Sequence, residues 1–446
     1  MTSATAPATE EAPRIGVAVL GATGVVGQKF VELLAASHPY FAIVAVTTGR
    51  KESVGQPYAS VTTWRLGGGS PIPPTVAALP MLPTDPEACW RAGARLAFSA
   101  LPTGVARVAE PLFAAAGFAV CSNSSPYRMG EHVPLLIPEV NADHVVPMVA
   151  AQKRVAAAAA AAPSHGSSSG RRHALSPTAA AAAQREGGFI VCNPNCTSTG
   201  LCMALAALKP FGLRRMVLTS MQALSGAGYP GVASLDVVAN VLPNVANGSE
   251  AKKLESEPRK ILGTVTEEGR SAESAEFIIS AHTNRVPVID GHTVCVSVEL
   301  QNPPATAEDV AQAMATFAPP GVVTRLPSSP AACIQVRREP QRPQPRLDIH
   351  AGGGMTAVVG QIARDNVFSY KFTVVSHNTV RGAAGGAILN AELLHALKLL
   401  PPPPPPPPST TTAVVGSTTR RDKGDDRRPS PSASEGPPPP SMRSHL

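Results

Sequence analysis

A glycine-rich turn between an apolar strand and an amphipathic helix is the feature that most narrows the folds open to this chain. Residues 14–20 (RIGVAVL) are typical of a buried strand, and GATGVVG follows at 21–27. Residues 28–38 (QKFVELLAASH) predict an amphipathic helix, and 41–49 (FAIVAVTTG) predict a second strand. A strand, a glycine turn, a helix and another strand within about 30 residues predict the first unit of a parallel sheet.

The same alternation continues further along the chain. Residues 96–102 and 118–125 predict two more strands, with a helix between them at 103–116. Another strand is expected in GFIVCNPN at 188–195. Strands that alternate with helices favour an α/β fold with a parallel sheet.

The glycine turn itself predicts a nucleotide site. Glycines here let the backbone approach a pyrophosphate, which then lies at the N-terminus of the following helix. The alternative is an ordinary tight turn. Short-chain dehydrogenases and sugar epimerases share the GxxGxxG spacing, but they need a lysine four residues after a tyrosine, and none of the five tyrosines has one. The predicted cofactor-binding residues are Gly21, Thr23, Gly24, Val25, Val26 and Gly27.

The end of the second strand indicates which dinucleotide binds. It reads Thr48-Gly49-Arg50-Lys51, with no acidic residue. An acid at this point would select NAD, whereas Arg50 and Lys51 suit the 2′-phosphate of NADP. The alternative is that both basic side chains are merely exposed. We therefore expect NADP(H) as the cofactor.

The cysteine usage argues for free thiols. The chain has seven cysteines, an odd number, and no CxxC pair. Neither a zinc ribbon nor a thioredoxin-type site is indicated, and we expect no metal site. Free thiols fit a reducing compartment, so we expect a cytoplasmic protein. Residues 1–13 lack an apolar signal core, although import into an organelle such as a plastid stays open.

One cysteine lies where its chemistry can be activated. A strand is expected to end at Asn193, Pro194 turns the chain, and Cys196 begins an apolar helix at 197–208. A helix N-terminus favours a thiolate, and its unpaired amides can stabilise an oxyanion. Cysteine is more often a small core residue, and that interpretation suits Cys192, Cys202 and Cys295, which lie inside apolar runs, whereas the polar turn around Cys196 favours a nucleophile.

A second polar turn carries an arginine and a histidine. The segment Arg285-Val-Pro-Val-Ile-Asp-Gly-His292 places a histidine on a glycine-containing turn. Histidine is a candidate general base, and a guanidinium seven residues earlier can bind a carboxylate with two hydrogen bonds. Taken alone, a histidine such as His292 is more often a routine turn residue than a catalyst.

Composition and charge exclude several classes of protein. Hydrophobic residues make up 43% of the 446 residues, enough for a real core. The net charge is +7, of which 151–187 carry +4 and 401–446 carry +2, leaving the remainder near +1. A body so weakly charged gives no reason to expect nucleic acid as a partner. No apolar run of about 18 residues predicts a membrane span, so no membrane partner is expected either.

Two segments interrupt the folded pattern. Residues 151–187 are rich in alanine and serine with no hydrophobic face, which predicts a low-complexity insertion. Residues 398–446 include a run of eight prolines and then a polar stretch, which predicts a disordered proline-rich tail. A spacer is favoured for the tail over a ligand for SH3 or WW domains.

Seven motifs in order resemble the aspartate-β-semialdehyde dehydrogenase family, and most of all its archaeal and fungal branch. They lie within residues 14–397, the insertion excepted. Each motif alone is weakly specific, but their order is highly specific. The motifs are GATGVVG, NSSPYRM, PEVN, NPNCTSTG, QALSGAGYPG, HTNRVPVIDGH and SHNTVRGAAGGA.

The resemblance implies a reaction. NADPH would reduce L-4-aspartyl phosphate to L-aspartate 4-semialdehyde and inorganic phosphate, a step toward lysine, threonine, methionine and isoleucine. Cys196 would attack the acyl phosphate and form a thioester, and His292 matches the acid/base of the family. Hydride transfer would then give a thiohemiacetal that collapses to the aldehyde.

The resemblance also implies roles for the remaining site residues. Asn195 and Gln222 match groups that position the substrate. Arg285 matches the α-carboxylate clamp, and Glu250 the carboxylate that takes the α-amino group. Arg128 and Lys253 match the phosphate site, although Lys252 is adjacent and the register of Lys253 could differ by one. Asn378 and Gly382 would contact the cofactor.

The implied architecture has two domains. An NADP-binding Rossmann-like domain is expected at 14–192 with 378–397, after a flexible N-terminus at 1–13. A mixed α+β domain at 193–377 would carry catalysis and oligomerisation, so a dimer or tetramer is expected.

Three other readings stay open. N-acetyl-γ-glutamyl-phosphate reductase shares the plan, but its substrate has no free α-amine for Glu250. Archaeal malonyl-CoA reductase resembles this branch closely and has no need to bind an amine. A non-catalytic scaffold is disfavoured, because Cys196, His292, Arg285, Arg128 and Lys253 are all present.

Overall fold

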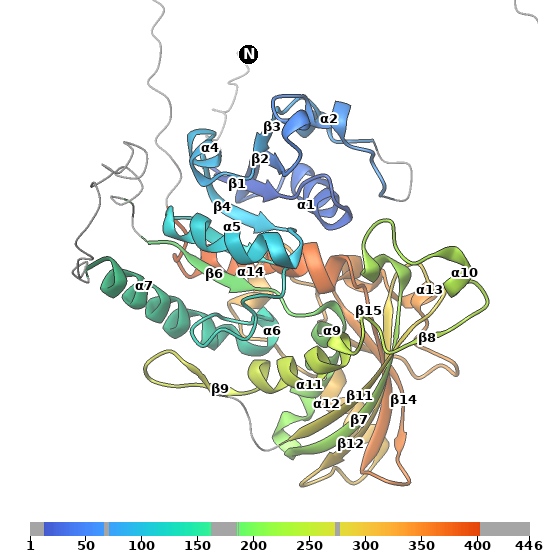
Figure 1. Cartoon of the computed structure of the whole chain (residues 1–446). Coiled ribbons are helices and arrows are strands. Elements are labelled where there is room, and N and C mark those ends of the chain that lie inside the picture. The colour runs from blue at the N-terminus through green and yellow to red at the C-terminus, as the bar shows by residue number, and fades with distance from the viewer. Residues whose placement is uncertain (1–12, 67–70, 162–184, 186, 273–276, 402–446) are drawn as a thin grey trace, which may run out of the picture. The chain divides into compact units, whose positions relative to one another are not determined.

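The structure consists of two β-sheets with helices packed against them (Figure 1). The computed structural model describes residues 13–66, 71–161, 185, 187–272 and 277–401. The predicted flexible N-terminus up to residue 12, most of the predicted insertion, and the tail from 402 lie outside the described residues.

The first sheet has six strands in the order β3-β2-β1-β4-β5-β6, and every neighbouring pair is parallel. The strand order reverses between β1 and β4, and ligands bind at the carboxyl ends of the strands at such a point. The predicted Rossmann-like fold is therefore confirmed. The strands are β1 (Ile15–Leu20), β2 (Phe41–Thr48), β3 (Met81–Pro83), β4 (Ala94–Ser99), β5 (Ala119–Ser122) and β6 (Phe189–Cys192).

Helices connect these strands, and one more helix, from near residue 390, packs against the same sheet. A π-helical turn, Val380–Ala384, leads into α14 (Gly385–Ala396), which contacts α1 and β5. α14 is buried along most of its length in the core of the first sheet. The other helices are α1 (Val25–Ala35), α2 (Tyr58–Val61), α3 (Pro74–Ala77), α4 (Pro86–Arg91), α5 (Thr103–Ala115), α6 (Pro138–Asn141) and α7 (Val145–Ala161).

The second sheet has seven strands of mixed direction, in the order β13-β14-β15-β12-β7-β11-β8. β11 runs parallel to β7, whereas β12 runs antiparallel to both β7 and β15. The strands are β7 (Leu213–Gln222), β8 (Leu242–Pro243), β11 (Ile278–Arg285), β12 (His292–Leu300), β13 (Ile334–Val336), β14 (Ala357–Arg364) and β15 (Tyr370–Ser376), and a separate short pair is β9 (Thr264–Val265) with β10 (Ser271–Ala272).

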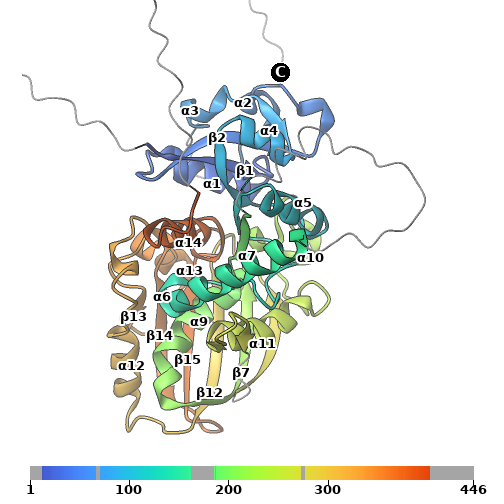
Figure 2. The same ribbon diagram turned by 90° about the vertical axis from the view of Figure 1, so that its left-hand side faces the viewer.

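Helices cover one face of this second sheet (Figure 2). Along β7, buried residues such as Leu218 alternate with more exposed ones such as Val217, as expected for a strand with one covered face. The predicted core position is wrong for Cys295, which is exposed on β12 because the apolar run around it belongs to a strand with one open face, whereas Cys192 and Cys202 are buried. The helices of this part are α9 (Cys196–Leu208), α10 (Ser234–Val237), α11 (Ser249–Ile261), α12 (Ala307–Ala315) and α13 (Pro345–Asp348).

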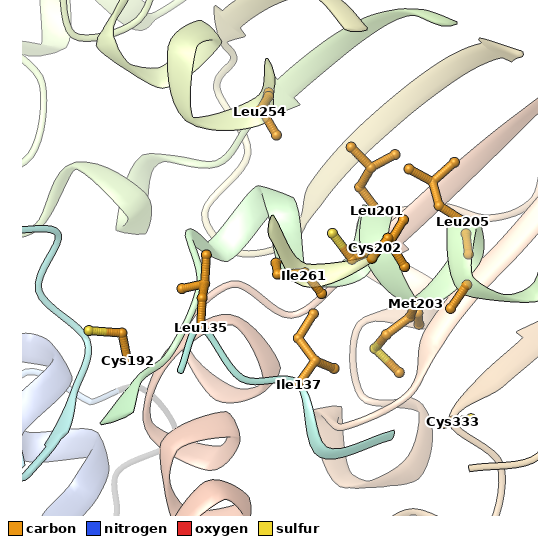
Figure 3. Packing of buried hydrophobic residues seen from close by; sticks show 14 of the residues in the cluster. Leu135, Ile137, Cys192, Leu201, Cys202, Met203, Leu205, Leu254, Ile261 and Cys333 are labelled. Carbon is orange, nitrogen blue, oxygen red and sulfur yellow. The ribbon is translucent and has the colours of Figure 1, made fainter. Parts of the chain in front are cut away.

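Helix α9 forms the centre of the core of this second part. Every residue of α9 after Cys196 is buried, because helices and the sheet surround it. Figure 3 shows Leu201, Cys202 and Leu205 of α9 together with Ile261 of α11. Packing on all sides fixes the position of α9, and therefore of the residue at its N-terminus.

Helix α7 continues into the segment predicted to be an insertion. It reaches residue 161, and Ala151 in this stretch is buried. Gln152 exchanges two hydrogen bonds with the backbone of Ile190 on β6, at 2.9 and 3.0 Å. The expectation that the segment lacks a packed face from residue 151 onward is thus wrong for its first turn, because Gln152 pairs with the edge strand of the sheet. No helix among the described residues is both long and apolar enough to cross a membrane.

Candidate active site

The turn after β6 places a cysteine at the start of α9. The side-chain Oδ1 of Asn195 accepts hydrogen bonds from the backbone amides of Thr197 and Ser198, at 3.0 and 3.3 Å. Asn195 is therefore the N-cap of α9, and Cys196 is its first residue. The predicted strand, proline turn and helix all occur in this order.

Cys196 lies in contact with His292. The distance from Cys196 Sγ to His292 Nε2 is 3.1 Å. His292 is the first residue of strand β12, following Gly291, rather than part of the turn itself. The backbone amide of Ala223 donates to His292 Nδ1 at 3.0 Å, so the proton of the neutral ring lies on Nε2 and faces the sulfur.

Burial dominates the electrostatics of this pair. It raises the pKa of the Cys196 thiol to about 11, and Glu250 adds to the rise while Arg128 opposes it. Burial lowers the pKa of His292 to about 3, with a further contribution from Arg285. The expectation that the helix N-terminus gives Cys196 thiolate character is wrong for this state, since loss of hydration outweighs the nearby positive charge. At neutral pH the resting pair is a thiol and a neutral imidazole.

Arg285 and Gln222 lie side by side at the ends of two parallel strands. They are paired in the register of β11 and β7. Arg285 Nη1 donates to the carbonyl of Ala223 at 2.6 Å, and Gln222 Nε2 donates to Ser220 Oγ at 3.3 Å. Both side chains are buried behind the cavity described below rather than on its wall.

The loop after β7 lies close against His292 and Arg285. A Cβ atom at Gly226 would lie 2.9 Å from His292 Cε1 and 3.0 Å from Arg285 Nη1. Only a glycine fits there without displacing one of these groups. Gly226 belongs to the QALSGAGYPG motif, but no role for it is predictable from the sequence, because a close approach between distant segments has no local signature.

The first turn of α11 brings an acid and a base to the same place. Glu250 Oε2 accepts from Asn195 Nδ2 at 2.8 Å, and Glu250 Oε1 accepts from Lys253 Nζ at 2.5 Å. Burial alone raises the pKa of Glu250, but Lys253 together with the Asn195 hydrogen bond and Arg128 brings it below its usual value. Glu250 is therefore ionised at neutral pH.

Arg128 is held by a residue that sequence analysis missed. Its Nη1 donates to Glu257 Oε1 at 2.9 Å, and its Nη2 donates to the carbonyl of Asn123 at 2.7 Å. Glu250, Lys253 and Glu257 stand at positions i, i+3 and i+7 of α11, so they share one face. That spacing is visible in the sequence and could have indicated Glu257.

These groups meet at a cavity of about 520 Å³ between the two sheets. Its wall combines the glycine turn before α1, the ends of β4 and β5, the start of α9 and the first turn of α11. The structure thus brings most of the predicted residues together. Predicted residues on the wall are Gly24, Val25, Val26, Arg128, Asn195, Cys196, Glu250, Lys253, Asn378 and Gly382.

Asn378 and Gly382 join the cavity from the segment before α14. Asn378 Oδ1 accepts from the amide of Gly291, and its Nδ2 donates to Ser225 Oγ, both at 2.8 Å. A Cβ at Gly382 would lie 2.7 Å from Cys196 Cα. The segment therefore supports the loops around the nucleophile as well as lining the cavity.

The glycine turn fits a dinucleotide. Gly21 has a φ of +75°, and a Cβ at Gly27 would lie 2.2 Å from the carbonyl oxygen of Gly21, so both positions require glycine. Gly24 caps α1 without a side-chain hydrogen bond, which leaves the first amides of the helix for a ligand. The carbonyl of Thr23 accepts from Gln28 Nε2 at 2.9 Å and stabilises the turn.

Arg50 and Lys51 lie apart from this wall. Both are exposed and follow the carboxyl end of β2, on the same edge of the sheet as the glycine turn. Within the described residues, no group of three or more histidine, cysteine, aspartate or glutamate side chains could hold a metal ion.

Another contact closes the space between the two sheets. The guanidinium of Arg65 lies over the ring of Tyr229, 3.4 Å from its centroid, and Tyr229 lines the cavity. The amide of Arg65 donates to Gln28 Oε1 at 2.8 Å, which ties this contact to the helix after the glycine turn. Neither residue was singled out in the sequence.

Comparison with known proteins places this geometry in context. A family model described as semialdehyde dehydrogenase, NAD binding domain, matches residues 16–147, and one described as semialdehyde dehydrogenase, dimerisation domain, matches residues 204–381. An aspartate-semialdehyde dehydrogenase of Archaeoglobus fulgidus is 43% identical, covering 87% of this chain and 100% of that protein. A malonyl CoA reductase (NADP) of Metallosphaera sedula is 36% identical, covering 84% and 96%. The crystal structure of aspartate semialdehyde dehydrogenase with NADP from Candida albicans gives a TM-score of 0.73 at 35% identity, covering 87% and 100%.

Proposed function

Because this chain belongs to the aspartate-semialdehyde dehydrogenase family, we propose that Cys196 and the groups around it carry out that family's reaction. The family predicted from the seven motifs is confirmed, and the enzyme uses NADP(H). The reaction is the NADPH-dependent reduction of L-4-aspartyl phosphate to L-aspartate 4-semialdehyde and phosphate. Two observations carry the assignment to Cys196. Its sulfur contacts the buried His292 at 3.1 Å, and Cys196 itself lines a cavity whose wall also holds Arg128, Glu250 and Lys253.

Cys196 is the nucleophile in this proposal. Its sulfur attacks the acyl carbon of the substrate, the bond from that carbon to the phosphate oxygen breaks, and a thioester with Cys196 remains. The leaving phosphate takes the thiol proton, and His292 donates a hydrogen bond from Nε2 to the sulfur as negative charge develops there. The amides of Thr197 and Ser198 at the start of α9 already donate to Asn195, so they are not part of the proposed oxyanion site.

Each of the remaining polar side chains is proposed to bind a different part of the substrate. Arg285 is proposed to bind the α-carboxylate, and Glu250, which is ionised, to bind the α-ammonium. Arg128 and Lys253 are proposed to bind the phosphate, while Asn195 and Gln222 position the reacting carbonyl. Gln222 and Arg285 lie behind the cavity wall and Gly226 lies against Arg285, so the substrate must reach both side chains past this loop.

NADP(H) supplies the hydride when bound. The turn of Gly21, Thr23, Gly24, Val25, Val26 and Gly27 is proposed to hold its phosphates, with Asn378 and Gly382 closer to the nucleophile. Arg50 and Lys51 are proposed to hold its 2′-phosphate.

One assay tests the activity and its alternatives together. The purified chain should reduce NADP when given aspartate semialdehyde and inorganic phosphate, and should not do so when phosphate is omitted. Malonyl-CoA and an N-acetylglutamyl phosphate analogue, tested with NADPH, should be poor substrates. Malonyl-CoA reduction is the second candidate because of the Metallosphaera sedula relative. Faster turnover of malonyl-CoA would replace the proposal.

Self-association is proposed through the open face of the second sheet. The match to a dimerisation domain indicates a homo-oligomer. The face opposite α9 exposes Val217, Ile278 and Cys295, and a hollow of about 420 Å³ lies on it. A second copy covering this face would bury its apolar side chains and give a dimer or tetramer. Sedimentation of the wild type and of Ile278→Lys should show the assembly weakened in the variant.

The domain limits and the compartment also remain proposals. We propose cofactor binding by residues 14–192 with 378–397 and catalysis by 193–377. All seven cysteines are free thiols in the structure, which supports a cytoplasmic location.

A further inference from the structure

Glu257 connects two parts of the proposed site that have separate tasks. It lies on α11 and is 2% exposed. One carboxylate oxygen, Oε1, accepts from Arg128 Nη1 at 2.9 Å, and the other, Oε2, accepts from the backbone amide of Asn195 at 2.6 Å. A single buried carboxylate therefore joins the guanidinium proposed to bind phosphate and the residue immediately before the nucleophile.

The bond to Asn195 acts on the position of Cys196. The side chain of Asn195 caps α9 and donates to Glu250, so its main chain sets where the helix and Cys196 begin. Its own amide lies before the helix, and Glu257 is the acceptor that satisfies it. Loss of that acceptor would leave a buried donor unpaired and free the turn to shift.

The bond to Arg128 acts on the anion site. Arg128 lines the cavity, yet its Nε is buried with no hydrogen-bond partner among the described residues. Nη1 donates to the Glu257 carboxylate, and Nη2 donates to the carbonyl of Asn123. Lys260, one turn further along α11, donates to the carbonyl oxygens of Arg128 and Gly130 at 2.7 Å, which fixes the backbone of the same segment.

We propose that Glu257 is a positioning residue that couples oxyanion binding at Arg128 to the placement of Cys196. An oxyanion at Arg128 competes with Glu257 for the guanidinium, and the carboxylate transmits this change to the amide of Asn195. The proposal rests on the function proposed above, which assigns phosphate to Arg128. It adds a link between the phosphate and thiol halves of the reaction.

The chemistry of the link requires a carboxylate. Both partners of Glu257 are donors, so both of its oxygens must accept. In Glu257→Gln the amide nitrogen must face either Arg128 or Asn195, and donor then opposes donor. Glu257→Asp keeps two acceptors on a shorter side chain and should restore part of the function. Glu255→Gln is a matched control on the same helix, because Glu255 accepts only from the amide of Ala281 among the described residues, and a glutamine oxygen can replace it.

Two readouts test the coupling. The first is the rate at which iodoacetamide alkylates Cys196 in the absence of substrate and cofactor. The second is the pair of KM values for inorganic phosphate and for semialdehyde. Glu257→Gln should change the alkylation rate and raise the KM for phosphate, each by at least about fivefold. The KM for semialdehyde should stay within about twofold, kcat should fall about tenfold to a hundredfold, and Glu255→Gln should resemble the wild type.

A double-mutant cycle separates coupling from stability and from long-range charge. Arg128→Ala should change the alkylation rate in the wild type and change it clearly less in the Glu257→Gln background, because the link is already broken. Equal effects in both backgrounds would overturn the proposal, as would a Glu257→Gln variant that loses only thermal stability. If Glu257→Gln does not fold, the cycle is run with Glu257→Asp, whose shorter link should make the effect of Arg128→Ala on the alkylation rate smaller than in the wild type but not abolish it. If the wild type shows no phosphate-dependent turnover but the cycle is still non-additive, the coupling stands and the proposed function fails.

Discussion

Two helices begin at the same cavity in different ways, and the contrast separates binding from catalysis. α1 follows β1 and α9 follows β6, so each starts at the carboxyl end of a parallel strand. Gly24 caps α1 with no side-chain hydrogen bond, whereas Asn195 caps α9 with two. The N-terminus of α1 is therefore open to a ligand, while that of α9 is already satisfied by the protein.

The comparison teaches that a helix N-terminus alone does not decide the chemistry beside it. At α1 the uncapped amides and the glycines leave room for phosphate groups. At α9, burial removes Cys196 from water and raises its pKa to about 11, although the helix N-terminus alone would lower that pKa. Activation of this thiol must then come from its neighbours, in particular from the Nε2 proton of His292.

The largest expected effect is at the nucleophile. Cys196→Ser should keep the fold and lower turnover by about four decades or more, since the serine hydroxyl is a much weaker nucleophile. Cys192, which is fully buried, provides the control through Cys192→Ala. Thiol labelling with and without substrate should show protection at Cys196. Protection of Cys192 with an inert Cys196 would contradict the assignment.

The pH dependence of the thiol sharpens the contrast next. Because the pKa of the thiol is about 11, the thiolate fraction increases tenfold with each unit of rising pH as long as the pH stays below that value. Alkylation of Cys196 by iodoacetamide in the substrate-free enzyme should therefore rise about a thousandfold from pH 6 to pH 9. His292, with a pKa of about 3, stays neutral throughout and should add no inflection. A plateau between pH 6 and 8 would mean that the helix N-terminus already stabilises a thiolate.

A methyl group at Gly226 tests how closely the loop after β7 packs against His292 and Arg285. The added Cβ in Gly226→Ala would lie 2.9 Å from the His292 ring and 3.0 Å from Arg285. One of them must move, and we expect kcat/KM to fall about a hundredfold from misplacement alone. Gly228→Ala is not a clean control because of its positive φ, but Gly104→Ala is, since no atom lies within 4 Å of its added Cβ. Unchanged kinetics in Gly226→Ala would show that the loop is displaced in the active state.

The basic residues after β2 lead to a prediction about which cofactor the α1 side of the cavity prefers. Arg50→Ala should weaken NADP binding by about 1.5–3 kcal/mol, the scale of a charge-assisted hydrogen bond. NAD binding should barely change, since NAD has no 2′-phosphate. The measurement is a titration of each cofactor by calorimetry. Equal losses for both would mean that Arg50 does not contact the 2′-phosphate.

The sequence predicted the parts of this molecule that are encoded locally. The strand–turn–helix units around Gly21 and Cys196 follow from short patterns, and the structure has both. Motif order gave the family, because several weak signals in one order are jointly specific. The thiol pKa of Cys196 was predicted in the wrong direction, since burial depends on helices and strands that are distant in the chain.

Other features of the site also depend on contacts between distant segments. Glu257 meets Asn195 and Arg128 across 62 and 129 residues of chain. Gly226 matters only because β11 and β12 bring Arg285 and His292 beneath it. The packed beginning of the predicted insertion was missed because a run of alanines shows no pattern, although Gln152 reaches the edge strand.

The smallest expected effect tests the caps themselves. Asn195→Ala removes the acceptor for two amides and makes the start of α9 resemble that of α1. An N-cap of this kind is worth about 1 kcal/mol, so the melting temperature should fall by about 2–4 °C.

Gly24→Ala is the matched change at α1, where there is no side-chain cap to lose. The nearest atom to its added Cβ is the Gly21 carbonyl oxygen at 3.5 Å, an ordinary contact, so stability should hold. Because Gly24 lines the cavity, that variant should instead weaken NADP binding. Calorimetric melting and cofactor titration of both variants measure the two effects, and a drop in melting temperature as large for Gly24→Ala as for Asn195→Ala would show that the two helix starts do not differ in the way proposed.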